Sequence, residues 1–150
     1  MKIALRYGLM VTAGVVAWTL IAHALVPDPR SAIHTLGAFT FFNLLHFASI
    51  FLGLKAWERE HQQKPTFREG VKQGVLISVV YAVTASLYFA ITLIVIGTRW
   101  MAAEATSPNE PMSRVALKAF AGLTLMTIFF GFIYSTLISF VVAKRLSTEP

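Results

Sequence analysis

Four long stretches without a charged side chain dominate this sequence. Residues 7–26, 36–54, 74–97 and 119–143 contain no Asp, Glu, Lys or Arg, and each is 19 to 25 residues long. A helix of about 20 apolar residues crosses the hydrocarbon core of a bilayer. The sequence therefore predicts an all-α polytopic membrane protein: one domain, residues 1–150, built as a four-transmembrane-helix bundle with short loops.

The composition agrees with a bilayer environment. Hydrophobic residues make up 56% of the chain and charged residues 13%, whereas a soluble domain carries about 25% charged residues. The absence of cysteine excludes disulfides, thiolate metal sites and iron–sulfur clusters. The net charge of +6 arises from basic residues that flank the apolar runs, so we expect the lipid bilayer, and not nucleic acid, as a partner.

The distribution of basic residues predicts the orientation of the chain. The two termini and the middle loop carry nine of them: Lys2, Arg6, Lys55, Arg59, Lys64, Arg68, Lys72, Lys144 and Arg145. The other two loops carry four: Arg30, Arg99, Arg114 and Lys118. Because short loops rich in Lys and Arg stay in the cytoplasm, we expect a multi-pass protein of a bacterial cytoplasmic membrane with both termini inside.

Local signals place several helix ends. Val26-Pro27-Asp28-Pro29 should break the first helix, and Pro65 should end the second. Thr66 and Glu69 have the spacing of a capping box, which predicts that the third helix begins at Thr66. Ser107-Pro108 has the form of a further helix start, for a fourth helix that is longer than the membrane is thick.

Small residues recur at every fourth position in three of the predicted helices. The third helix carries Gly70, Gly74, Ser78, Ala82, Ser86 and Ala90, the fourth Thr127, Gly131, Ser135, Ser139 and Ala143, and the first Ala4, Gly8 and Thr12. Although such residues are common in spans, ladders of this length predict close helix packing, either within the chain or against a second one. Because each step turns by about 40°, we expect the two halves of the third helix's ladder to meet different neighbours.

The second span holds a notable set of polar residues. Asn43, His46 and Ser49 share one arc of the helix with Gly53, and we expect this arc to face the bundle. Large apolar residues occupy the other side, where we expect lipid: Phe41, Leu44, Phe47 and Phe51.

His46 lies ten residues into its span, about 15 Å deep and near the midplane of the membrane. An ionisable residue at this depth is a candidate functional residue. The structural alternative, which we favour, is a neutral imidazole bonded to Asn43, to a serine or to a backbone carbonyl of a neighbouring helix. A charge at this depth would cost about 2.5 kcal/mol or more.

No motif points to catalysis or to a cofactor. The spans contain no paired carboxylates, and the chain lacks His-Glu-x-x-His, a phosphate-binding glycine loop and Gly-x-Ser-x-Gly. His23 and His34 share a depth at which a tetrapyrrole would be geometrically possible, and His46 alone is compatible with a chlorin, but no motif supports either. We therefore expect no enzyme activity, no metal and no cofactor.

Two stretches of the chain carry a family resemblance. The first runs from Phe51-Leu52-Gly53-Leu54-Lys55 through Thr66-Phe67-Arg68-Glu69-Gly70-Val71-Lys72-Gln73-Gly74, and the second from Gly131-Phe132-Ile133-Tyr134-Ser135 through Ala143-Lys144-Arg145. Together they resemble a bacterial family of small four-span integral membrane proteins that is catalogued as a domain of unknown function. The loop at 98–118 is shorter than the family pattern. The resemblance implies the four-span topology and brings no activity, cofactor or site residues.

The expected function follows by exclusion. We expect a non-catalytic integral membrane protein that acts as an accessory or scaffold subunit or associates with itself, with other membrane protein subunits or a second copy as partners. A small transporter or channel unit is the first alternative, and a cofactor-binding subunit of a membrane complex is the second. A dry bundle around Asn43 and His46 would favour the first reading, whereas a water-filled path beside them would favour transport.

Overall fold

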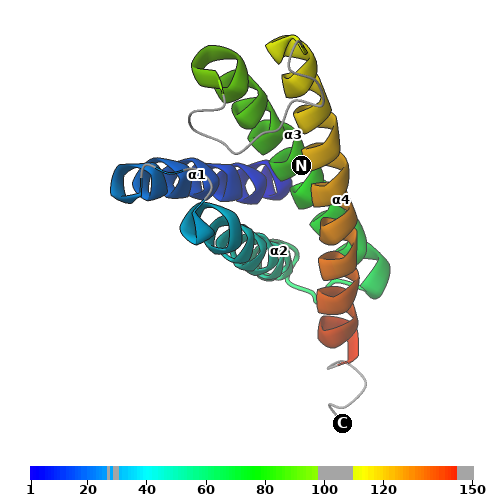
Figure 1. Cartoon of the computed structure of the whole chain (residues 1–150). Helices are drawn as coiled ribbons and strands as arrows, with labels where there is room; N and C mark the ends of the chain where they lie inside the picture. The colour runs from blue at the N-terminus through cyan, green and yellow to red at the C-terminus, as the bar shows by residue number, and fades with distance from the viewer. Residues whose placement is uncertain (27, 29–30, 98–109, 145–150) are drawn as a thin grey trace.

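The computed structural model describes residues 1–26, 28, 31–97 and 110–144 (Figure 1). Its elements follow in the order α1 (Lys2–Leu25), η1 (Ile33–Gly37), α2 (Ala38–His61), α3 (Phe67–Ile96) and α4 (Met112–Lys144). The element η1 is a short π-helical turn that leads directly into α2. Within the described residues, four helices are long and apolar enough to cross a membrane. The predicted all-α, four-transmembrane-helix fold is confirmed.

The end of α2 is set by the backbone and not by proline. The helix continues past its apolar stretch to His61, and Gln62 then adopts the left-handed conformation with φ of 53°. A left-handed residue directly after the last turn is a common way to end a helix. The prediction that Pro65 ends α2 is therefore wrong by about one turn, because Gln62 reverses the backbone first.

The start of α3 is the capping box that the sequence predicted. The backbone N–H of Thr66 donates to Oε2 of Glu69 at 2.9 Å, and the backbone N–H of Glu69 donates to Oγ1 of Thr66 at 3.4 Å. Two N–H groups that the first turn leaves without helical partners are thereby satisfied, and α3 begins at Phe67.

α4 begins at Met112, just after Pro111, whose carbonyl accepts from the backbone N–H groups of Arg114 and Val115. The helix start predicted at Ser107-Pro108 lies outside the described residues. With 33 residues, α4 extends for about 50 Å, which exceeds the ~30 Å hydrocarbon core of a typical bilayer.

α3 is the central helix of the bundle. It packs against α1, α2 and α4, and its most extensive interface is with α4. Figure 1 shows α1 and α2 leaving the α3–α4 pair on one side, so that the far end of α1 lies apart from the upper ends of α3 and α4. The two helix pairs therefore diverge towards one end of the molecule.

The buried apolar side chains explain this divergence. At the end of the bundle that holds the loop between α2 and α3, all four helices meet in one cluster: Ala4, Ile50, Leu54, Ile77 and Ile138. Towards the opposite end, one cluster joins α3 to α1, with Phe42 and Leu45 of α2 packed against it: Val11, Val15, Tyr81 and Ala85. A separate cluster there joins α3 to α4: Ala90, Leu93 and Ala116. The core is thus continuous at one end and divided at the other.

The small-residue ladders of α3 and α4 face each other. Across the interface, Gly70 faces Ser139, Gly74 faces Ser135, and Ser78 faces Gly131. A Cβ atom on any of the three glycines would overlap the facing serine, so only glycine allows the two backbones to approach this closely.

The prediction that the two halves of the α3 ladder meet different helices is wrong at the end of the ladder that holds Ala90. Ala90 packs with Ala116 of α4, the same helix that Gly70 meets at the start of the ladder. The two helices cross each other (Figure 1), and a crossed pair follows the ridge of residues spaced by four along its length. Ala82 and Ser86, the other two members of this half, are buried.

α1 packs on a different face of α3. A Cβ atom on Gly8 would lie 2.6 Å from the side chain of Val80, and Ala4 is buried nearby in the common core. One turn further along, the hydroxyls of Thr12 and Thr84 are hydrogen-bonded at 2.6 Å. The short ladder of α1 therefore also lies at a helix–helix contact within the chain.

Candidate functional site: a lateral cavity beside His46

His46 lies where three helices meet. It projects from α2, is 2% exposed, and its Nε2 is 2.8 Å from Oγ of Ser78 on α3. Gly131 of α4 lies against both side chains, because a Cβ atom there would overlap Ser78 and approach Cε1 of His46 to 3.1 Å. The absence of a side chain at Gly131 therefore creates the space in which the imidazole and the hydroxyl meet.

The tautomer of His46 is coupled to the hydroxyl of Ser78. This hydroxyl lies within hydrogen-bond distance of Nε2 of His46 and of the carbonyl of Gly74, one turn earlier, to which it can donate its only hydrogen at 2.9 Å. In this arrangement Ser78 accepts from Nε2 of a neutral imidazole, and Nδ1 is the acceptor nitrogen. Nδ1 makes no hydrogen bond to a described residue, and neighbouring atoms do not cover it completely.

Asn43 does not bond to His46. Its Nδ2 donates to the carbonyl of Phe39 at 2.7 Å, and its Oδ1 accepts from the hydroxyl of Tyr134 on α4 at 2.6 Å. Asn43 thus links α2 to α4, while His46 links α2 to α3. Of the partners that the sequence left open for His46, the structure selects a serine on α3.

Ser49 is buried two turns away from Asn43, and its hydroxyl donates to the backbone carbonyl of Tyr7 on α1 at 3.0 Å. The three polar residues of α2 therefore contact three different helices instead of forming one cluster. Tyr134 is a polar partner that sequence reasoning missed, because a tyrosine in an aromatic-rich span is not marked by spacing.

The phenylalanines of α2 do not all face lipid as expected. Phe41 stacks on Trp18 of α1, with ring centroids 4.7 Å apart, and is only partly exposed. Phe47 and Phe51 are exposed on the surface, as is Leu44. The prediction for Phe41 is wrong because α1 packs close to that side of α2 near its start.

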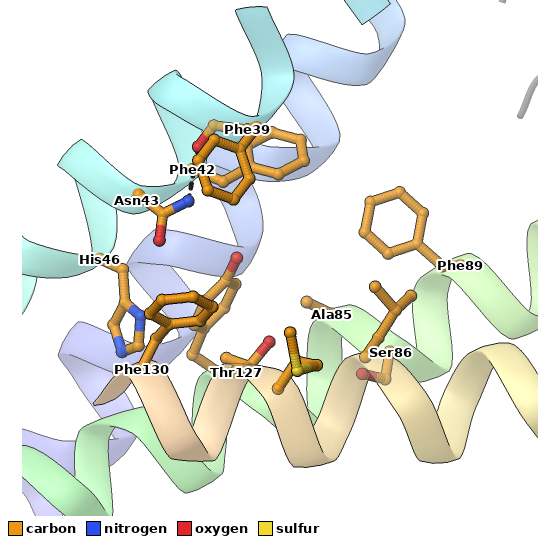
Figure 2. Close-up of a pocket in the computed structure, with 12 residues that line it drawn as sticks. Phe39, Phe42, Asn43, His46, Ala85, Ser86, Phe89, Thr127 and Phe130 are labelled. Carbon is orange, nitrogen blue, oxygen red and sulfur yellow. Dashed lines mark hydrogen bonds between the residues drawn. The ribbon is translucent and has the colours of Figure 1, made fainter. Parts of the chain in front are cut away.

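A cavity of about 410 Å³ opens directly beside His46. Figure 2 shows its lining side chains converging from α2, α3 and α4. The full set is Phe39, Phe42, Asn43, His46, Tyr81, Ala85, Ser86, Phe89, Leu123, Met126, Thr127 and Phe130. Its size and its aromatic lining are typical of sites for small molecules.

The cavity lies where the two helix pairs diverge. Ala85 and Phe42 belong to the cluster around α1, α2 and α3, and the α3–α4 cluster begins at Ala90 beyond it. At its rim, Phe39 on α2 is 60% exposed and Met126 on α4 is 57% exposed. Both belong to helices that are long and apolar enough to span a membrane, so in a bilayer these exposed lining side chains of α2 and α4 would face lipid, and we call the cavity lateral for this reason.

No group of three or more metal-ligating side chains is present within the described ranges. The rings of His23 and His34 approach with centroids 6.1 Å apart, and Nε2 of His34 lies 2.6 Å from the carbonyl of Val26. His34 is thus engaged with the end of α1.

Comparison with known proteins found no matching family model, no matching curated protein and no matching solved structure. The class of protein is therefore defined by the fold and the site alone: a four-span membrane protein with an apolar lateral cavity beside a buried histidine.

Proposed function

We propose that this chain is a non-catalytic multi-pass membrane protein, an accessory subunit that acts by binding another component of the membrane. The observation that carries this proposal is the lateral cavity between α2 and α4, which is open to the lipid side and lined by aromatic and aliphatic side chains. A cavity of this kind binds a partner through non-covalent contacts and leaves the partner chemically unchanged.

The hydrogen bonds near the midplane support binding over transport. His46 is bonded to Ser78, and Asn43 to Tyr134 and to the backbone of its own helix. These polar groups hold helices together, and the cavity beside them is mainly apolar. A proton or ion pathway would instead need polar or ionisable groups along its length.

The small-residue ladders restrict how a partner can bind. The ladders of α3 and α4 already pack against each other within the chain, for example where Gly70 faces Ser139. Self-association through these ladders would therefore require the bundle to open, which favours a different component over a second copy. A location in a bacterial cytoplasmic membrane and membership of the small four-span family belong to the same proposal.

The test is purification in mild detergent followed by native mass spectrometry. The wild-type chain should carry a bound component of defined mass. Thr127→Phe places a ring in the cavity and should release that component, whereas Leu125→Phe, a matched change at a 69% exposed position of the same helix, should retain it. A wild-type chain without any bound component, in detergent and in lipid nanodiscs, would overturn the proposal.

A further inference from the structure

We propose that the lateral cavity binds a neutral lipophilic molecule that carries a hydroxyl group, and that Nδ1 of His46 accepts the hydrogen bond from that hydroxyl. The inference rests on the proposed binding function and names the chemical class of the ligand. Three properties of the cavity lead to it: its walls, its unused acceptor and its position in the membrane.

The walls select an apolar ligand with a ring or a chain. Phe42, Phe89 and Phe130 come from three different helices and enclose the cavity. Aromatic rings in this arrangement favour edge-to-face or offset contacts with a further ring, and they also pack well against alkyl chains. The volume of about 410 Å³ lies within the range of small-molecule pockets and suits the head of a lipophile whose tail extends into the bilayer.

The unused acceptor selects a hydrogen-bond donor on the ligand. Nδ1 of His46 makes no hydrogen bond to a described residue, and when Ser78 donates to Gly74 and accepts from Nε2, the lone pair of Nδ1 remains for a ligand. An acceptor without a partner in an apolar site is unfavourable. Tyr81 and Thr127, which carry hydroxyls, are also among the lining residues, so an oxygen that both donates and accepts suits this lining better than a group that only accepts.

The lining also explains why the ligand is neutral. No Asp, Glu, Lys or Arg contributes to the cavity wall, and a charged group that enters it would lose its hydration without gaining a counter-charge. The rim residues Phe39 and Met126 are exposed on membrane-spanning helices. The ligand therefore enters sideways from the bilayer, where neutral lipophiles are concentrated.

A phenol and its methyl ether, in which a methyl group replaces the donated hydrogen, test the proposal on the unmodified chain. In phosphatidylcholine nanodiscs, binding of para-nonylphenol is compared with binding of its methyl ether, para-nonylanisole, after subtraction of the uptake into empty nanodiscs. The phenol should bind about fivefold more tightly, the ratio that corresponds to one net hydrogen bond. Equal binding of the two probes to the wild-type chain would overturn the role of Nδ1.

Variants locate the effect in the cavity. His46→Phe keeps a ring of similar size, removes the acceptor and should reduce the preference for phenol over ether to about one. Thr127→Phe should abolish binding of both probes, and the control Leu125→Phe should change neither. Should His46→Phe fail to fold, the comparison of the two probes on the wild-type chain and the two phenylalanine variants still decides the question.

The outcomes separate this inference from the proposed function. A copurifying component that Thr127→Phe releases, together with equal affinities for phenol and ether, would overturn the ligand class and leave the accessory role intact. A protein chain found in the cavity in place of a small molecule would do the same. Absence of cavity-dependent binding of any component would overturn both.

Discussion

Nε2 of His46 and Oγ of Ser78 are hydrogen-bonded at 2.8 Å, and this bond joins α2 to α3 near the middle of the membrane-spanning segments. Oγ of Ser78 also lies 2.9 Å from the carbonyl of Gly74, to which it can donate. The same contact lies against Gly131, so α4 is also part of the arrangement. A buried imidazole is thereby held in one position beside the lateral cavity.

Replacement of Ser78 should destabilise the bundle. Ser78→Ala leaves Nε2 of His46 without its hydrogen-bond partner, and we expect the free energy of unfolding to fall by about 1 to 2 kcal/mol. Reversible unfolding in mixed micelles measures this change. Ser86→Ala is the matched control, since Ser86 is also buried on α3 but makes no hydrogen bond to a described residue. Equal effects of the two substitutions would contradict the role of the His46 bond.

Leucine in place of the ladder glycines should separate α3 from α4. Gly74→Leu and Gly131→Leu each place a large side chain against a facing serine, and we expect a clear decrease in the melting temperature in detergent, because overpacking at close contacts costs about 1 to 3 kcal/mol. Gly122→Leu provides the control, since a Cβ atom there meets nothing within 4 Å. If Gly74→Leu and Gly131→Leu melt with the wild type, the interface has been misassigned.

The bond between Tyr134 and Asn43 should couple α2 to α4 energetically. A double-mutant cycle with Tyr134→Phe and Asn43→Leu removes the 2.6 Å contact, and we expect an interaction energy of about 0.6 kcal/mol, the average for such pairs in membrane helices. Tyr88→Phe in place of Tyr134→Phe should give no coupling with Asn43→Leu. A coupling energy of zero for Tyr134 would show that the two helices are held by packing alone.

The basic residues predict the orientation of the chain. A reporter that is active only outside the cytoplasm should be silent when fused after Pro150 and active when inserted near Asn109, because nine of the thirteen Lys and Arg residues lie at the termini and in the middle loop. The reverse pattern of activity would exclude an orientation with both termini in the cytoplasm.

The part of the site that the sequence predicted best is the one that depends on helical periodicity. The spacing of Asn43, His46 and Ser49 indicates that they face other helices, and all three contact a neighbouring helix in the structure. Periodicity says which face of a helix is polar, but not which helix lies opposite. Periodicity alone therefore leaves Asn43 as a candidate partner of His46 and gives no indication of Tyr134.

The sequence by itself determined the four spans and the start of α3, because both depend on local properties. Transfer of apolar side chains into lipid acts on each segment separately, and the capping box joins residues only three positions apart. The divergence of the two helix pairs, the cavity and the bonding of His46 were decided by the tertiary structure alone. They depend on how the helices rotate and cross, since His46 and Ser78 are 32 positions apart and Asn43 and Tyr134 are 91 apart, and no local pattern specifies contacts at that separation.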